Sequence, residues 1–327
     1  MNILYILGNG FDIAQGMKTK YSDFYKYLIR KKCSPLLKEM RREINTDTKL
    51  WSDMEIALGE YTNKFSVPYE YLELHIELIK ELCRYLAQEE EKYNPSDTEK
   101  TTFKFNILHP EDYLFPYDKE LFKRITKGLS SISNQVSFIS LNYTNTLIKL
   151  LSTTEEMKSF MNINTDNCRN ILYLHGYLKS NGIIIGVSDS EQIKNENLRN
   201  DPDIGNIIIK EKTNASIGNT STTHCERMIK NADIIVIYGT SLGDTDNYLW
   251  RIIEKNFKTR SNLCIIQHIY DMEFNNALPQ ERRIYDHKYQ DLFLKKINFL
   301  NANTQQKERI FCVYNQNFTK PINLEIL

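Results

Sequence analysis

The feature that most constrains the fold is a set of short aliphatic or β-branched runs, several of which are apolar at every position. These runs are Ile3–Leu7, Val136–Leu141, Ile171–Leu174, Ile183–Gly186, Asp233–Tyr238 and Leu263–Gln267, with a more weakly marked one at Ile310–Val313. A strand that is apolar on both faces must be covered on both faces, which is typical of parallel strands with helices between them. The sequence therefore predicts an α/β fold with a Rossmann-like parallel sheet and helices on both faces.

Residues 51–129 differ in pattern from the parts of the chain that carry these runs. Apolar residues recur there at intervals of three or four, with charges on the other faces, as at Leu72, Ile76, Ile79, Cys83 and Leu86. This periodicity predicts a helical insertion, and residues 1–50 and 130–327 then form the Rossmann-like nucleotide-binding domain. We expect the insertion to cap the ligand site, because it follows the first strand and its turn. The polar segment 189–223 is expected to form a long mobile loop that can act as a lid.

The composition narrows the class of protein. Lys+Arg and Asp+Glu are equal at 42 each among 327 residues, so there is no basic footprint for nucleic-acid binding as the main task. No apolar run reaches the ~20 residues that a membrane helix needs. The N-terminus lacks the basic region and the apolar length of a signal peptide. We therefore expect a cytoplasmic protein without a membrane partner.

The cysteines favour free thiols over a metal site. They lie far apart and include no C-x-x-C pair, at Cys33, Cys83, Cys168, Cys225, Cys264 and Cys312. Structural zinc sites usually take two ligands from one close pair, so we expect no metal here.

The first strand runs directly into Gly8-Asn9-Gly10, followed by Phe11-Asp12. Glycines at the carboxyl end of a strand let the backbone approach a phosphate, and the start of the next helix attracts anions. The pattern is shorter than the dinucleotide fingerprint G-x-G-x-x-G, and a tight turn explains the same glycines. If the loop binds a phosphate, Gly10→Val should block nucleotide binding and leave the fold intact.

Two further strand ends carry Asn142 and His175. Thr144 or Asn145 can cap the helix that follows the first of them, but capping does not explain Asn142. A histidine at a strand end is suited to accept a proton near pH 7, and a purely structural histidine is the alternative. If both strands lie in one parallel sheet, Asn142 and His175 face one cleft.

The late strand ends in Gly239-Thr240-Ser241-Leu242-Gly243, followed by Asp244 and Asp246. Amides and hydroxyls in this turn can hold a ribose or a phosphate, and Asp246 can accept hydrogen bonds from ribose hydroxyls. A glycine turn with Asp244 as the cap of the next helix is the alternative.

Trp51 and Glu55 lie four residues apart and would share one face of a helix. A packing face with a solvated carboxylate is the expected role of this pair. A wall of the ligand pocket is the alternative.

Together these stretches resemble the AbiH family of bacterial abortive-infection proteins. The resemblance rests on "LGNGFDIAQGMKTKYSDF", "WSDMEIALGEY", "FISLNYTNTL", "LHGYL" with "IIIGVSD", and "VIYGTSLGDTDNYLW". These blocks follow one another from residue 4 to about residue 250. The resemblance implies a role in defence against bacteriophages.

The AbiH family is in turn similar to sirtuin-type NAD-binding proteins. The matching positions are Gly8 and Gly10, Asn142, His175-Gly176 and Gly239-Thr240-Ser241. This similarity implies a sirtuin-like fold that takes NAD as its ligand or substrate, with His175 and Asn142 as catalytic residues. The residues expected to bind the nucleotide are Gly8, Asn9, Gly10, Asp12, Thr144, Gly239, Ser241 and Asp246. The four-cysteine zinc module of sirtuin deacetylases is absent and Asn145 replaces the usual acid, which argues against deacetylation.

Two hypotheses on function follow from the resemblance. The first is an antiphage effector that hydrolyses NAD at the nicotinamide N-glycosidic bond and is switched on by a phage-derived trigger. The alternative is a non-catalytic sensor or scaffold that binds NAD or ADP-ribose. In that case the helical insertion binds a partner or other copies of the chain, as a homo-oligomer.

Overall fold

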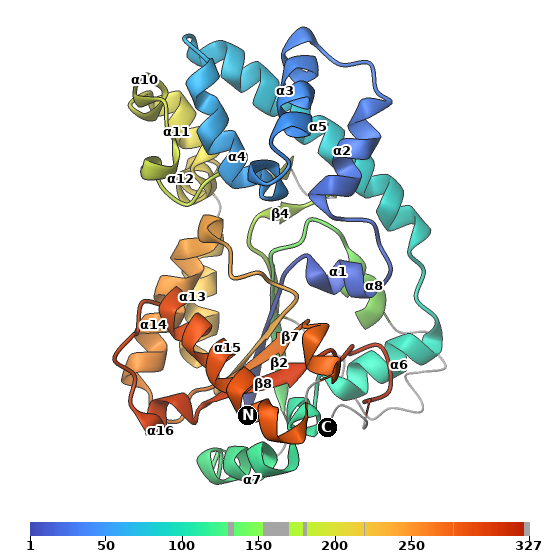
Figure 1. Cartoon of the computed structure of the whole chain (residues 1–327), viewed down its shortest axis with the longest axis vertical. Helices are drawn as coiled ribbons and strands as arrows, with labels where there is room; N and C mark the ends of the chain where they lie inside the picture. Colours follow the sequence, from blue (N-terminus) through green and yellow to red (C-terminus); the bar gives the residue numbers. More distant parts are fainter. Residues whose placement is uncertain (130–133, 153–169, 179–181, 219, 277, 324–327) are drawn as a thin grey trace.

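The chain folds into a parallel sheet covered by helices, with a further group of helices beyond the carboxyl ends of the strands (Figure 1). This computed structural model describes residues 1–129, 134–152, 170–178, 182–218, 220–276 and 278–323. The expected domain boundary at residue 130 and the thiol of Cys168 lie outside these ranges. No helix within them is long and apolar enough to cross a membrane.

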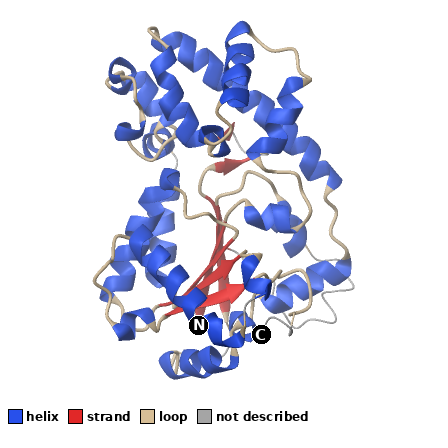
Figure 2. Cartoon of the chain, in the orientation of Figure 1, coloured by secondary structure: helices blue, strands red, loops and turns tan. Residues whose placement is uncertain are grey.

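The sheet has six strands in the order β3-β2-β1-β6-β7-β8, and every neighbouring pair is parallel (Figure 2). The strands are β1 (Asn2–Leu7), β2 (Gln135–Ser140), β3 (Asn170–Tyr173), β6 (Ile234–Tyr238), β7 (Cys264–Ile269) and β8 (Ile310–Tyr314). When only these strands are counted, the order is the doubly wound arrangement 3-2-1-4-5-6. The expected Rossmann-like α/β fold is therefore confirmed.

One expected strand lies outside this sheet. Within the run Ile183–Gly186, only the first residue is in a strand, β5 (Gly182–Ile183), which pairs antiparallel with β4 (Gly176–Tyr177). The run is apolar for another reason, because Ile183 and Ile185 are buried in the core of the helical group. Apolarity marks burial, and a buried loop segment carries the same signal as a central strand.

The side chains of β1 show why the strands lack polar alternation. Tyr5 and Leu7 enter one hydrophobic core, while Leu4 and Ile6 enter another on the opposite face. The first core includes residues of α1 (Gly10–Ala14), α6 (Asp97–Asn106), α7 (Pro116–Ile125) and α8 (Thr146–Leu151). The second includes residues of α13 (Ser221–Asn231), α14 (Asn247–Thr259) and α15 (Arg282–Lys296). Helices therefore cover both faces of the sheet, as expected.

A third hydrophobic core lies in the helical group beyond the carboxyl ends of the strands, which we call the cap (residues 20–92 and 182–216). Its long helices are α2 (Tyr21–Ile29), α3 (Pro35–Thr46), α4 (Met54–Tyr61) and α5 (Pro68–Lys92). This grouping differs from the expected insertion at 51–129, because α2 and α3 join the cap whereas α6 and α7 pack on the sheet. An amphipathic helix shows one apolar face in its sequence, but not which core that face enters.

Residues 189–223 are largely helical, so the expectation of a long mobile loop is wrong. They contain a 3-10 turn, Ser190–Gln192, and α10 (Glu196–Arg199), α11 (Pro202–Ile208), α12 (Lys210–Ser216) and the start of α13. The carboxylate or amide oxygens of Asp189, Asn195 and Asp201 accept hydrogen bonds from the first backbone amides of these helices. The same residue types are favoured in loops and at helix N-caps, so composition does not separate the two.

A buried histidine of α5 links the two parts of the cap. The Nε2 of His75 donates to the carbonyl oxygen of Ile185 at 3.1 Å, and Nδ1 has no partner among the described residues. Burial lowers the pKa of His75 to about 4. The folded chain therefore resists a proton that the unfolded chain binds below about pH 6.5. The free energy of unfolding must fall as the pH falls from about 6.5 towards 4.

We expect the wild type to lose about 2 kcal/mol more stability than His75→Gln when the pH is lowered from 7 to 5. Glutamine can still donate to the carbonyl of Ile185 but does not titrate. Urea unfolding of both proteins at the two pH values measures this difference. Equal losses would show that His75 is not held in its neutral form by the cap.

Candidate functional site

A cavity of about 920 Å³ lies between the cap and the carboxyl ends of the strands. All ten residues that the sequence analysis selected line it: Gly8, Asn9, Gly10, Asp12, Asn142, Thr144, His175, Gly239, Ser241 and Asp246. They follow β1, β2, β3 and β6, which are neighbours in the sheet. Parallel strands bring their carboxyl ends to one edge, and this explains why distant segments of the chain converge here.

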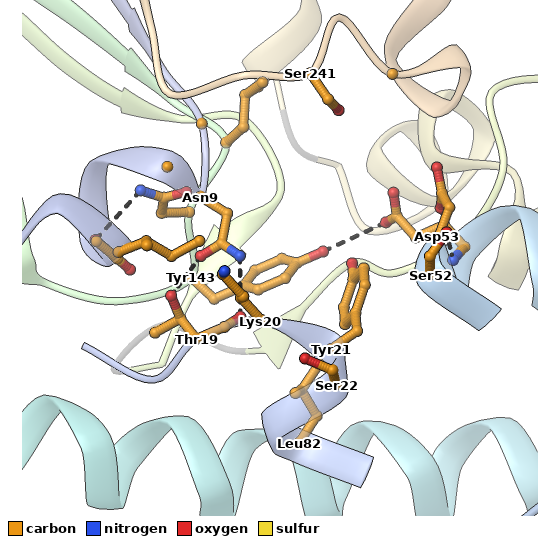
Figure 3. A pocket seen from close by; sticks show the side chains of 18 of the residues that line it. Asn9, Thr19, Lys20, Tyr21, Ser22, Ser52, Asp53, Leu82, Tyr143 and Ser241 are labelled. Atoms are coloured by element: carbon orange, nitrogen blue, oxygen red, sulfur yellow. Dashed lines mark hydrogen bonds between the residues drawn. The ribbon is translucent and has the colours of Figure 1, made fainter. Parts of the chain in front are cut away.

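The cap supplies an apolar and aromatic wall of the cavity (Figure 3). Residues of this wall include Tyr21, Tyr25, Ile44, Trp51, Leu82 and Leu86. Trp51 and Glu55 both line the cavity but do not share a helix, because Trp51 lies in the 3-10 turn Leu50–Ser52 and α4 starts after the N-cap Asp53. Trp51 and Glu55 therefore form part of the cavity wall, which was the alternative role for this pair. The carboxylate of Glu55 is buried and not solvated.

The glycines of the first loop pack against the loop that follows β6. The amide of Gly8 donates to the carbonyl of Tyr238 at 2.9 Å, and that of Gly10 to the carbonyl of Gly239 at 2.7 Å. A Cβ on Gly10 would lie 2.6 Å from the Cα of Gly239. Both amides are thus used within the protein and not free to hold a phosphate. The expectation that Gly10→Val leaves the fold intact is therefore wrong.

Asn9 fastens the chain segment between α1 and α2. Its Nδ2 donates to the carbonyl of Thr19 at 2.9 Å, and the Thr19 hydroxyl donates to its Oδ1 at 2.5 Å (Figure 3). Both ends of the Asn9 amide are therefore occupied by Thr19. The next residue, Lys20, lines the cavity and has no ion-pair partner among the described residues. The other two lysines that line the cavity are already paired, Lys26 with Asp23 and Lys210 with Glu55 and Asp246, so Lys20 carries the positive charge available to an anionic ligand.

Asp12, Asn142 and Thr144 form a buried hydrogen-bonded group on the cavity wall. Asn142 Nδ2 donates to Asp12 Oδ1 at 3.3 Å, and Thr144 Oγ1 donates to Asp12 Oδ2 at 2.6 Å. Burial raises the pKa of Asp12 to about 6, although the hydroxyls of Thr144 and Thr146 lower it. A carboxyl group with this pKa can take up and release a proton near neutral pH.

The start of α8 is held by contacts other than a side-chain cap. Thr144 donates to Asp12, and Asn145, which occupies the N-cap position, makes no capping hydrogen bond with its side chain. Instead, the backbone amide of Asn145 donates to Glu90 Oε2 at 2.8 Å, and its Nδ2 lies 3.3 Å from the same carboxylate. Glu90 of α5 therefore ties the cap to this loop.

A second buried group contains His175, Asp246, Lys210 and Glu55. His175 Nε2 lies 2.8 Å from Asp246 Oδ1, and Lys210 Nζ lies 3.1 Å from the same oxygen and 2.7 Å from Glu55 Oε2. Burial alone would raise the pKa of Asp246, but Lys210 and His175 lower it well below its usual range. Burial alone would lower the pKa of Lys210, but Asp246 and Glu55 raise it. Both groups therefore stay charged at neutral pH.

One ring nitrogen of His175 is left without a partner. A carboxylate only accepts hydrogen bonds, so Nε2 donates to Asp246, and in the neutral imidazole Nδ1 is an acceptor. Nδ1 is buried and has no hydrogen-bond partner among the described residues. Leaving a buried acceptor unpaired is unfavourable, and this points to a donor supplied by a ligand or a water molecule. No group of three or more His, Cys, Asp and Glu side chains in the described ranges is placed to hold a metal ion.

Lys210 is a buried site residue that the sequence analysis missed. It is the first residue of α12 and follows Ile208 and Ile209, which are both buried. The backbone of Val187 holds this point of the chain, because Lys210 N donates to its carbonyl at 3.0 Å. The apolar run before Lys210 was the available signal for burial, but a lone lysine in a polar segment gives no pattern to search for.

We expect Gly239→Ala to lower the free energy of unfolding by at least about 3 kcal/mol. The φ of Gly239 is +69°, and its Cβ would lie 2.4 Å from the amide nitrogen of Phe11. Gly16→Ala is the matched control, because Gly16 also has a positive φ, +79°, but no atom within 4 Å of the added Cβ. Gly16→Ala should lose only about 1 kcal/mol. Similar losses in urea unfolding would mean that the two loops can separate freely.

Lys210→Met removes the cation from two buried carboxylates, and we expect a loss of about 3–5 kcal/mol in the free energy of unfolding. Adding Glu55→Gln to Lys210→Met should restore part of this loss, which a double-mutant cycle measures. The control is Lys194→Met, which breaks an exposed pair with Glu60 at 3.5 Å and should lose at most about 1 kcal/mol. Equal effects of the two lysine variants would contradict a role of Lys210 in holding cap and sheet together.

Comparison with known proteins identifies the family of this chain. Among curated proteins, none matches the chain. The family described as bacteriophage abortive infection AbiH matches residues 4–268. This span covers most of the chain and includes every cavity residue named above. The chain therefore belongs to the AbiH family of bacteriophage abortive infection proteins, whose role is defence against phage.

Proposed function

We propose that this protein acts in phage defence by hydrolysing the bond between nicotinamide and ribose in NAD. The observation that carries the proposal is the buried pair of His175 and Asp246, whose free Nδ1 has no partner among the described residues. The position of the cavity supports it, because doubly wound sheets bind dinucleotides where the strand order reverses, here between β1 and β6. The cavity volume of about 920 Å³ is also large for a small-molecule site.

The residues around the cavity fit the demands of this reaction. Cleavage of the bond develops positive charge on the ribose. The ionised carboxylate of Asp246, which is bonded to His175, stabilises this charge. Nδ1 of His175 can accept a hydrogen bond from a ribose hydroxyl or from water. Asn142 does not exchange protons at this pH, so its part is to orient a reacting group through its amide. Nicotinamide leaves as a neutral molecule, so the reaction needs no acid at the leaving group.

The other parts of a dinucleotide find matching groups in the cavity. The rings of Tyr21, Tyr25 and Trp51 supply apolar surface for a heteroaromatic base on the cap side. Lys20 supplies positive charge for a phosphate, which the amides of Gly8 and Gly10 cannot hold because they are bonded within the protein. Phosphate binding in this proposal therefore rests on Lys20 and not on the first loop.

A non-catalytic sensor or scaffold is the second candidate, and one observation favours it. The glycine loop lacks free amides at Gly8 and Gly10, so the strongest phosphate-binding feature of dinucleotide folds is missing. In this alternative the cavity binds NAD or ADP-ribose without turnover. The bound nucleotide would then stabilise one position of the cap.

We expect purified protein to release nicotinamide from NAD, and His175→Ala and Asn142→Ala to lower the release by at least about 10²-fold. His109→Ala is the control, because the side chain of His109 is 42% exposed and does not line the cavity. Melting temperatures measured alongside separate loss of chemistry from loss of fold. NAD content should also fall in phage-infected cells that carry the wild type. NAD binding without release, in both the purified protein and infected cells, would favour the sensor.

A further inference from the structure

The proposed reaction requires one group to take a proton from the attacking water, and two groups of the cavity offer an acceptor. We propose that Asp12 accepts this proton and that Asn142 orients the water, while His175 binds the ribose. This inference rests on the proposed function, because it says which residues act on the water and which residue binds the ribose in that same reaction. The segment that follows β1 then contributes a catalytic carboxylate from α1 and not a phosphate cradle.

Asp12 fixes the orientation of the Asn142 amide. Asp12 as a carboxylate only accepts, so Asn142 must turn its NH₂ group towards it, as the 3.3 Å contact from Nδ2 shows. The amide oxygen of Asn142 is then left over, and it has no hydrogen-bond partner among the described residues. A water that donates one hydrogen to this oxygen and the other to Asp12 has its lone pair free for the ribose carbon. Both side chains line the cavity, so a water can reach them there.

The two aspartates of the cavity have opposite surroundings. Asp246 Oδ1 is engaged by both His175 and Lys210, and the buried cation keeps that carboxylate ionised. Asp12 forms no ion pair with any residue that the structure describes. Its neighbours are the donors Asn142, Thr144 and Thr146 and the titratable groups Glu90, Tyr93 and Tyr173, none of which is positive. Carboxyl groups whose environments drive their proton affinities apart divide the acid–base work of a site, and Asp12 is the one that can take up a proton near neutral pH.

The step balances without a further reactant. The bond between ribose C1′ and the pyridinium nitrogen breaks, and its electron pair goes to that nitrogen, so nicotinamide leaves uncharged. The water oxygen bonds to C1′, and the proton of the water passes to the Asp12 carboxylate and then to solvent. No electron is transferred, and the product is ADP-ribose. His175 stays with Asp246 throughout and holds the ribose through Nδ1.

The first test is Asp12→Asn, which keeps the size of the side chain and an oxygen that accepts from Asn142. We expect this variant to bind NAD with a Kd within about threefold of the wild type and to release nicotinamide at least about 10²-fold more slowly. The wild type should lose kcat/KM below about pH 6, where Asp12 becomes protonated. In the NAD-free protein, a ¹³C carboxyl titration should show a group near this pH that Asp12→Asn lacks.

Two variants outside the cavity lining test whether the fall of kcat/KM at low pH, the acid limb of the pH profile, belongs to Asp12. Glu90 raises the pKa of Asp12 and the Thr146 hydroxyl lowers it. Glu90→Gln should therefore move the acid limb of kcat/KM to lower pH, and Thr146→Val should move it to higher pH. A limb that belongs to His175 would not move in opposite directions with these two changes. This pair decides the question even if Asp12→Asn does not fold.

The outcomes separate the inference from the proposed function. A wild type that releases no nicotinamide, with no fall of NAD in infected cells, overturns the proposed function. An active wild type together with Asp12→Asn within threefold of its rate overturns only the role of Asp12. The role of Asp12 is also overturned if Glu90→Gln and Thr146→Val leave the acid limb where it is in the wild type.

Discussion

The buried ammonium group of Lys210 is the interaction on which the cap, the sheet and the site all depend. It lies between Glu55, which comes from a cap helix, and Asp246, which follows the last strand of the cavity edge. Burying two carboxylates would be unfavourable without a cation between them. Because Asp246 also holds His175, the position of the cap and the orientation of the histidine are set by one charge cluster. A movement of the cap would therefore alter the site directly.

The close approach of two loops is a second constraint on the architecture. Gly10 and Gly239 meet backbone to backbone, and this contact joins the carboxyl ends of β1 and β6, the pair at which the strand order reverses. In many dinucleotide-binding folds, glycines at this point make room for a pyrophosphate. In this protein the space is filled by the neighbouring loop, and the amides of Gly8 and Gly10 are already bonded. The same residue pattern thus serves the packing of the two loops.

The lining of the cavity contains two polar groups of side chains and one apolar wall. One group is built around Asp12, which hydroxyl and amide donors surround, and the other around Asp246, which a lysine and a histidine surround. Glu55 and Glu90 extend these groups into the cap, through Lys210 and Asn145 respectively. Polar contacts thus join the cap to the loops at the strand ends both near Lys210 and near Asn145.

The sequence by itself determined the sheet and the edge at which its polar residues gather. Continuous apolar runs such as Ile234–Tyr238 can only be buried on both faces, and parallel pairing then brings residues like Asn142 and His175 to one cavity. Tertiary structure alone decided what each polar side chain contacts. Nothing local in the sequence shows that Lys210 is buried between Glu55 and Asp246, or that α3 belongs to the cap while α6 lies on the sheet. The physical reason is the distance along the chain over which each signal acts. Patterns of burial and periodicity are visible within a few residues, whereas ion pairs and loop contacts join distant segments that only the complete fold brings together.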